Sequence, residues 1–316
     1  MTKEISSFYR AVPLVLLLIL ICLSCNPKPD GNLTPTKQDN VLSELFSEIP
    51  SAKKLNSESI ANLKGTRLAS WNIRDLGRTK NSEEIYTIAN TLRDFDIVAI
   101  QEVVAKDPAG AQAVAKIADE LTRMGAKWDY KISDPTQSPS VYMSERYAFL
   151  WKTAKVSLAN IPFLDKELQD ICYREPYIAA FKAKTDSKPF YIVNFHSRKY
   201  YDKPELEIVH FINYEERLES RNIIIAGDFN LSETYNVWEP FYDRGFKSAL
   251  KNEATTLKTK CKNGVYTNHA IDNFYFSSAI EMQKSGSIDF VKNCDDLQSA
   301  RLISDHLPIF LEFKTH

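Results

Sequence analysis

Glycine is scarce in this sequence, with nine residues among 316. Neither a G-x-G-x-x-G sequence nor a Walker A loop occurs, which argues against a glycine-rich phosphate cradle. An excess of charge of one sign is absent too, because 40 Lys and Arg residues are balanced by 41 Asp and Glu residues. No overall basic field therefore attracts nucleic acid, and contact with a polyanion requires a local patch or a bound cation.

Cysteine is also infrequent, and two of the five cysteines, Cys22 and Cys25, lie in the N-terminal leader. The other three, Cys172, Cys261 and Cys294, form neither a disulfide framework nor a C-x-x-C zinc motif. An oxidising compartment would permit one bridge. Cys261 and Cys294 are the favoured pair because both lie in polar, loop-like sequence, although the sequence leaves open whether they are bridged. Cys172 precedes a strand and is expected to be a buried free thiol.

Long hydrophobic runs are limited to residues 11–24. Fourteen residues are too few to span a bilayer, which needs about 20, but they suit the apolar region of a signal peptide. Residues 1–25 are therefore predicted to be an export signal. Ser24-Cys25 resembles a bacterial lipobox, in which the cysteine is acylated and anchors the protein to a membrane. Ordinary cleavage with secretion and an uncleaved anchor remain the alternatives.

Residues 26–65 are predicted to be a polar tether with a short lead-in helix over 41–49. Residues 66–316 are predicted to form one domain of the α/β class. Some strands join by a hairpin, as 179–183 and 190–196 do, so a purely parallel sheet is excluded. Mixed sheets packed face to face, with flanking helices, fit the pattern best. The expected strands are 67–73, 96–103, 128–133, 147–158, 179–183, 190–196, 222–226, 272–277 and 307–313; the expected helices are 82–95, 109–124, 205–218 and 237–244.

Polar side chains gather at the ends of the expected strands, where sites of α/β proteins usually lie. Five short motifs carry them: Trp71-Asn72, Gln101-Glu102-Val103, His196-Ser197, Gly227-Asp228-Phe229-Asn230 and Ser304-Asp305-His306. Carboxylates and carboxamides without a thiol suit a hard cation, Mg²⁺ or Mn²⁺. Imidazoles beside such a cation can move protons, and phosphoester hydrolysis needs these parts.

In this order, the five motifs resemble those of the endonuclease/exonuclease/phosphatase superfamily. The resemblance implies a four-layer α/β/β/α sandwich. The stretches 144–151 and 173–181 are similar to the deoxyribonuclease I branch. That resemblance implies the following roles. The catalytic residues would be His196, His306, Glu145, Asp228, Asp272 and Asn230; the substrate-binding residues Arg174, Asn230, Asn72 and Tyr142; and the metal ligands Glu102, Asp305 and Asn72.

The chain departs from the branch at three positions. Val104 stands where an arginine often enters the DNA minor groove, Tyr142 lies one residue further from the glutamate than the usual groove tyrosine, and Cys261 lacks its usual partner cysteine. The resemblance implies a phosphodiesterase that uses Mg²⁺, with Mn²⁺ or Ca²⁺ as alternatives, and the N-terminal leader predicts that it is exported. DNA and a membrane are its expected partners, with no protein partner. A sphingomyelinase-like or inositol-phosphate phosphatase-like enzyme is the alternative, and a non-catalytic binding module is a third hypothesis.

Overall fold

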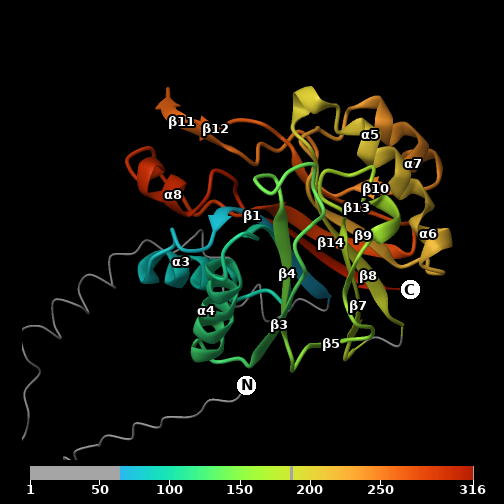
Figure 1. Cartoon of the computed structure of the whole chain (residues 1–316), viewed down its shortest axis with the longest axis horizontal. Helices are drawn as coiled ribbons and strands as arrows, with labels where there is room; N and C mark the ends of the chain where they lie inside the picture. Colours follow the sequence, from blue (N-terminus) through green and yellow to red (C-terminus); the bar gives the residue numbers. More distant parts are fainter. Residues whose placement is uncertain (1–64, 186–187, 316) are drawn as a thin grey trace, which may run out of the picture. The chain divides into compact units, whose positions relative to one another are not determined.

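The computed structural model describes residues 65–185 and 188–315 (Figure 1). The predicted leader, tether and lead-in helix lie outside the described residues. Among the described residues, no helix is long and apolar enough to cross a membrane.

Two mixed sheets form the centre of the described region. The six-stranded sheet has the order β14 (Ile280–Ser287), β15 (Ile309–Thr315), β1 (Thr66–Leu76), β2 (Ile97–Val104), β4 (Glu145–Lys152) and β3 (Trp128–Ile132). The seven-stranded sheet has the order β10 (Lys247–Ser248), β13 (Asp272–Phe276), β9 (Ile223–Asp228), β8 (Phe190–His196), β7 (Tyr177–Ala183) and β5 (Val156–Leu158), with β6 (Phe163–Leu164) also paired to β7. In each sheet one central pair is parallel, β1 with β2 and β8 with β9, and the other pairs are antiparallel.

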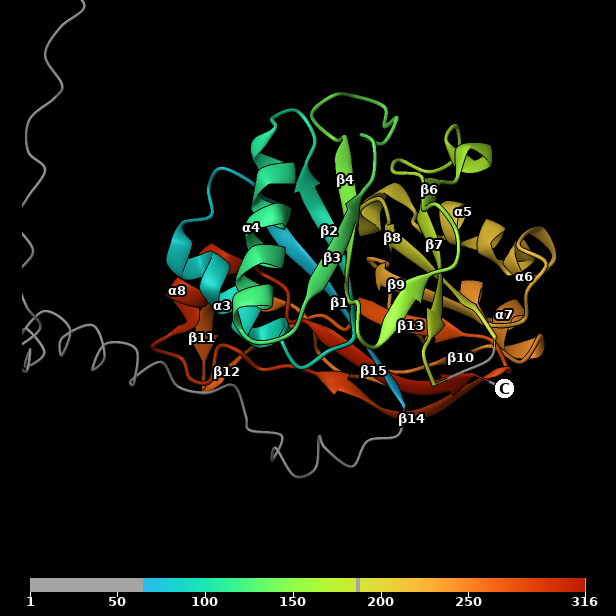
Figure 2. The ribbon, with the colours of Figure 1, turned by 90° about the horizontal axis from the view of Figure 1, so that it is seen from below.

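Three hydrophobic clusters produce four layers, α/β/β/α, as the resemblance implied (Figure 2). Strand β2 shows how: Val98 and Ile100 face the helices, whereas Ile97 and Ala99 face the other sheet. This alternation is what a strand buried on both faces requires. The outer face of the six-stranded sheet packs on α3 (Ser82–Leu92), α4 (Ala109–Arg123) and α8 (Leu297–Ile303). The seven-stranded sheet packs on α5 (Glu205–Ile208), the 3₁₀ helix η3 (Val209–Asn213), α6 (Tyr214–Arg217) and α7 (Glu239–Asp243).

Local sequence explains where the first helix begins. The Asn81 side chain accepts a hydrogen bond from the backbone N–H of Glu84, and the Glu84 carboxylate accepts one from the backbone N–H of Asn81, which makes a capping box. Ile85, Ile88, Ala89 and Leu92 then form its buried face.

Three predicted elements differ from the structure. The strand expected over 147–158 is two strands, β4 and β5, in different sheets, because the chain turns at residues 153–155. The helix expected over 205–218 is broken into α5, η3 and α6, and that over 237–244 is η4 (Asn236–Trp238) followed by α7. Strand β14, helix α8 and the ribbon of β11 (Leu257–Lys262) and β12 (Val265–Thr267) were not predicted.

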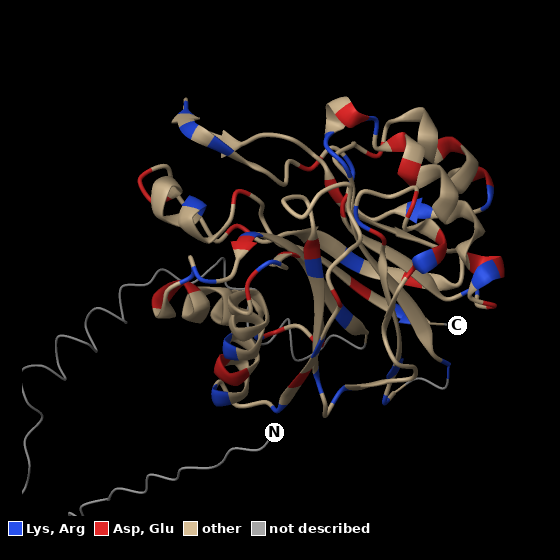
Figure 3. Cartoon of the chain, viewed as in Figure 1, with Lys and Arg blue, Asp and Glu red and all other residues tan. Residues whose placement is uncertain are grey.

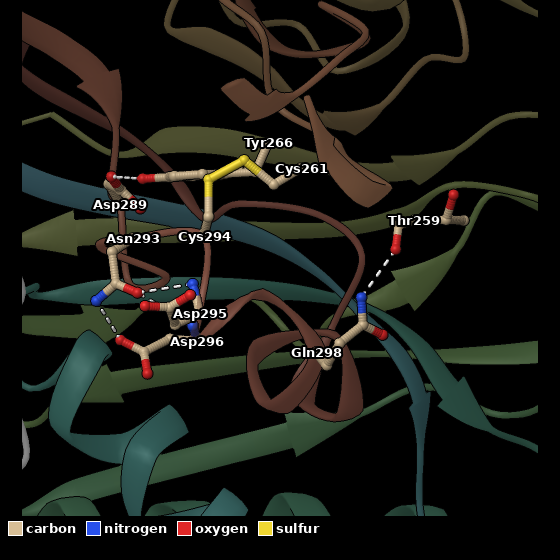
Figure 4. Close-up of a disulfide and its surroundings, with 9 residues drawn as sticks. All are labelled: Thr259, Cys261, Tyr266, Asp289, Asn293, Cys294, Asp295, Asp296 and Gln298. Carbon is tan, nitrogen blue, oxygen red and sulfur yellow. Dashed lines mark hydrogen bonds between the residues drawn. A yellow bond between two sulfur atoms is a disulfide. The ribbon is translucent and has the colours of Figure 1, made fainter. Parts of the chain in front are cut away.

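The ribbon of β11 and β12 is joined covalently to the body of the domain. Cys261 and Cys294 form a disulfide with a Cα–Cα distance of 5.6 Å, as the sequence favoured (Figure 4). Nearby, the Tyr266 hydroxyl donates to Asp289, and the Gln298 amide donates to the carbonyl of Thr259 at 2.8 Å. Cys172 is buried and free, as expected.

Candidate active site

The site forms where the central parallel strands of both sheets end. In the seven-stranded sheet, His196 of β8 is directly opposite Asp228 of β9, and Asp228 is opposite Asp272 of β13. In the six-stranded sheet, Asn72 of β1 is opposite Gln101 of β2, one residue before Glu102. The Asn72 amide donates a hydrogen bond to Asp228, so the strand ends of the two sheets meet.

Gly227 allows the backbones of β8 and β9 to meet closely beside Asp228. Its φ is +146°, and a Cβ atom there would lie 1.8 Å from the carbonyl oxygen of Phe195. Any larger residue would clash with that backbone, so glycine sets the approach of His196 and Asp228.

His196 is held by a buried ion-pair network. Its Nδ1 lies 2.9 Å from Glu145 Oε2, and Glu145 Oε1 lies 2.8 Å from Nε of Arg174. Burial alone would raise the pKa of Glu145, but the charges of His196 and Arg174 lower it to about 2. Burial and Arg174 act to lower the pKa of His196, and the facing Glu145 carboxylate raises it overall.

His306 has a similar arrangement from the opposite side of the site. Its Nδ1 lies 2.9 Å from Asp272 Oδ2, the same oxygen that accepts a 2.6 Å hydrogen bond from the Thr255 hydroxyl. Burial would lower the pKa of His306, but Asp272 and Asp228 raise it to about 10. The pKa of Asp272 is itself raised, by burial first.

Asp228 connects the two histidines. Its Oδ2 lies 3.5 Å from His196 Nε2 and 3.7 Å from His306 Nε2, and it accepts a 3.1 Å hydrogen bond from the Asn72 amide. Asn230 has a positive φ of 51° and donates its backbone N–H to Asp228 Oδ1 at 2.9 Å. The structure thus brings together both predicted imidazoles and all three of the carboxylates predicted to act with them.

The chemistry around Glu102 fits a divalent cation. The Asn72 amide donates to Glu102 Oε1 at 2.9 Å, while the buried Asn72 Oδ1 has no hydrogen-bond partner. Burial, and then Glu145, raise the pKa of Glu102, so a positive partner would stabilise its charged form. Two groups of described residues offer ligand atoms within 4.8 Å of one another: Glu102, Glu145 and His196, and Asp228, Asp272 and His306.

Asp305, the other predicted carboxylate ligand, belongs to neither group. Its Oδ2 lies 3.9 Å from Arg74 Nη1 and 3.8 Å from Arg301 Nη2, in a partly exposed position. Its role as a ligand stays a prediction.

A cavity of about 1020 Å³ opens onto these groups. The predicted substrate residues Arg174, Asn230 and Tyr142 line it, and Tyr142 is 85% exposed. Two other basic side chains have partners within the protein: Arg198 pairs with buried Glu207, and Lys80 donates to the carbonyl of Leu302. Lys199 is exposed and lines the cavity.

Sequence reasoning did not assign a role to four residues at the site. Thr255 lies 17 residues from Asp272, in a stretch without a motif. Gln101 donates to Asn194 Oδ1 at 2.6 Å and so joins the two sheets beneath the site, but it was noted only as a neighbour of Glu102. Tyr200 and Tyr235 line the cavity, and only their aromatic character in loops after β8 and β9 would have drawn attention to them.

This combination of sandwich and paired imidazoles defines a class of enzymes that hydrolyse phosphoester bonds. The chain belongs to the endonuclease/exonuclease/phosphatase family, whose profile matches residues 69–306. Members of this family usually depend on a metal ion.

Two curated relatives of the chain are deoxyribonucleases. The chain is 29% identical over 283 residues to a deoxyribonuclease from Thioalkalivibrio sp. (strain K90mix), covering 82% of this chain and 73% of that protein. It is 22% identical to deoxyribonuclease-1-like 2 of Mus musculus, covering 79% and 92%. A crystal structure of a family member from Bacteroides thetaiotaomicron has the same fold, with a TM-score of 0.57, 16% identity and coverage of 80% and 98%.

Proposed function

We propose that this chain is a divalent-metal-dependent endonuclease that hydrolyses phosphodiester bonds of DNA. The arrangement of His196 and His306 around Asp228 carries the proposal, because both imidazoles have their Nδ1 atoms held by carboxylates and turn their Nε2 atoms toward the same point beside Asp228, where one phosphate could meet both. The names of the two deoxyribonuclease relatives support DNA over another phosphoester.

In this mechanism the two histidines divide the proton transfers. A water attacks phosphorus while one imidazole, with Asp228, accepts its proton, and the other imidazole donates a proton to the leaving oxygen or stabilises its charge. Glu145 and Asp272 fix the ring orientations and favour the charged form of each ring. Arg174, which is buried and lines the cavity, supplies positive charge to the phosphate, and Asn230 positions it.

Glu102 and Asn72 would hold the divalent cation, with Asp305 as the further predicted ligand. The cation would neutralise charge on the phosphate oxygens. The partnerless Asn72 Oδ1 and the half-buried Glu102 carboxylate, whose pKa is raised by desolvation, are the features of this chain that support such a site.

A plasmid-nicking assay tests the function. The enzyme should convert supercoiled DNA to open circles with Mg²⁺ and stop when a chelator is added, and His306→Ala should be inactive. Sphingomyelin, inositol phosphates and p-nitrophenyl phosphate are assayed in parallel. Faster turnover of one of these with no nicking would assign the enzyme to the alternative phosphoesterase function, and no turnover of any substrate would favour a binding module.

We also propose that the protein is exported and anchored through an acylated Cys25, with secretion as the alternative. The bridged Cys261 and Cys294 support export, because disulfides persist in oxidising compartments. Cys25→Ser should abolish lipid labelling and move the protein out of the membrane fraction. Labelling that persists in this variant would overturn the anchor.

A further inference from the structure

Two tyrosines stand beside the catalytic groups on loops that follow neighbouring strands. Tyr200 lies four residues after His196, in the 3₁₀ helix η2 (Tyr200–Asp202), and Tyr235 lies seven residues after Asp228, just before η4. Because β8 and β9 are parallel neighbours, both loops leave the sheet at the edge where the site forms. Both tyrosines line the cavity.

The two rings hold one another in a fixed arrangement. Their centroids lie 6.0 Å apart and their planes make an angle of 78°, an edge-to-face contact. Even so, Tyr200 is 60% exposed and Tyr235 is 39% exposed. Aromatic surface left open at the rim of a polar cavity is typical of a binding site.

The loop that carries Tyr200 is anchored by contacts of Arg198. Arg198 Nε lies 3.0 Å from the buried Glu207 carboxylate, and the Arg198 guanidinium stacks 4.3 Å from the ring centroid of Tyr173. These contacts hold the backbone two residues before Tyr200, which lowers the ordering cost of binding in this loop.

The neighbouring charges match one ligand chemistry. Exposed Lys199 precedes Tyr200 directly and lines the same cavity. An aromatic face beside a cation suits a nucleotide, whose base stacks on the ring while its phosphate meets the charge. The volume of about 1020 Å³ exceeds what a phosphate group alone needs.

The geometry of stacking indicates whether the DNA substrate is single-stranded or duplex. In a duplex each base face is covered by its neighbours, so a tyrosine at the cavity rim can stack only on a base that is unpaired or extruded. On the other side of the site, Val104 is packed near Gly77 and bears no group that could read a groove.

We propose that Tyr200 and Tyr235 form a stacking subsite for an unpaired base, and that the enzyme prefers single-stranded to duplex DNA. This proposal rests on the proposed hydrolysis of DNA and adds the substrate class.

The test compares kcat/KM on three substrates: a labelled single-stranded oligonucleotide, the same sequence as a duplex, and bis(p-nitrophenyl) phosphate, which has no base. Wild type should favour the single strand. Tyr200→Ala and Tyr235→Ala should each lower kcat/KM on the single strand about 5-fold to 100-fold more than on bis(p-nitrophenyl) phosphate, since a base stacked on an aromatic ring contributes about 1–3 kcal/mol. Tyr200→Phe should restore the preference, and Tyr242→Ala is the control, at a tyrosine of α7 that is 36% exposed and outside the cavity lining.

Binding provides a second readout. In the His306→Ala background, oligo(dT) should bind more tightly than a duplex of equal length, and Tyr200→Ala should remove the difference. A wild-type enzyme that cleaves duplex at least as well as single strand, or equal losses by Tyr200→Ala on all three substrates, overturns the subsite and leaves the nuclease function standing. Hydrolysis of bis(p-nitrophenyl) phosphate with no cleavage of either DNA overturns the proposed function itself.

Discussion

His196 and His306 direct their Nε2 atoms to the same carboxylate oxygen, Oδ2 of Asp228, at 3.5 Å and 3.7 Å. The Nδ1 atom of each ring is already bonded to a carboxylate, Glu145 in one case and Asp272 in the other. One phosphate in front of Asp228 can therefore contact both imidazoles, which makes the pair a single functional unit.

Alanine at either histidine should lower kcat by about 10²- to 10⁴-fold, the usual range for a general acid or base. The double variant should lose far less than the product of the two single losses, because the residues act together. His210→Ala, in η3 and outside the cavity lining, is the control. Two single variants within tenfold of wild type would exclude the proposed division of proton transfer.

Glu102→Gln should nearly abolish hydrolysis while leaving the melting temperature close to that of wild type. The substitution keeps the shape of the side chain but removes the charge expected to hold the cation. The measurement is a Mg²⁺ titration of activity, with Glu83→Gln, on the exposed first turn of α3, as control. Full activity at limiting Mg²⁺ would show that Glu102 is not a ligand.

Thr255→Val should reduce kcat about tenfold or more. The change removes the 2.6 Å hydrogen bond that the Thr255 hydroxyl donates to Asp272. The buried Asp272 carboxylate then has one hydrogen-bond donor fewer and holds the His306 ring less firmly. Thr255→Ser keeps the hydroxyl and should retain most activity. If the valine and serine variants have the same kcat, the hydroxyl is not what positions Asp272.

The sequence predicts several of the proposed catalytic groups because they sit in short motifs at the end of apolar strands. His196 and Asp228 are such residues, and the parallel pairing of their strands follows from the helix between them. Thr255 escaped prediction because its partner Asp272 is brought to it by tertiary pairing and no local pattern marks it.

Two of the errors in the fold concern strands. Residues 147–158 contain two short apolar stretches separated by Lys152, Thr153 and Lys155, and the chain crosses from one sheet to the other at this separation, which the prediction of a single strand overlooked. Strand β14 has a single buried side chain, Ile280, so it shows no alternation of buried and exposed residues from which a strand could be predicted.

The disulfide should contribute about 3–4 kcal/mol to the free energy of unfolding, since Cys261 and Cys294 are 33 residues apart and the bridge restricts the unfolded chain. The double variant Cys261→Ser/Cys294→Ser should therefore unfold at lower denaturant concentration, and a reducing agent should shift wild type but not the variant. Cys172→Ser, which replaces the buried free thiol, is the control for the effect of removing a cysteine without breaking the disulfide. Identical midpoints with and without reductant would contradict this contribution.

The free energy of unfolding should increase as the pH rises above about 8, because the pKa of Lys152 is lowered in the folded protein. Burial lowers its pKa to about 8 from the ordinary 10.5, so between these values the unfolded chain binds more protons than the folded one. Lys152→Met lacks this dependence, and its advantage over wild type in free energy of unfolding should be largest below pH 8 and shrink toward pH 10.5. Lys155→Met, at an exposed neighbour, should show no such trend in denaturant titrations.

Lysines 258, 260 and 262 give β11 three positive charges, and no acidic residue lies between 257 and 267 (Figure 3). The ribbon begins at the site itself, because Thr256 bridges to His306 and the next residue starts β11. Replacing all three lysines with glutamine would therefore change how strongly a long polyanion is retained between successive cuts. Such a change would appear in the size distribution of the products, as fewer cuts on each molecule before release, with the chemistry of a single cut unaltered.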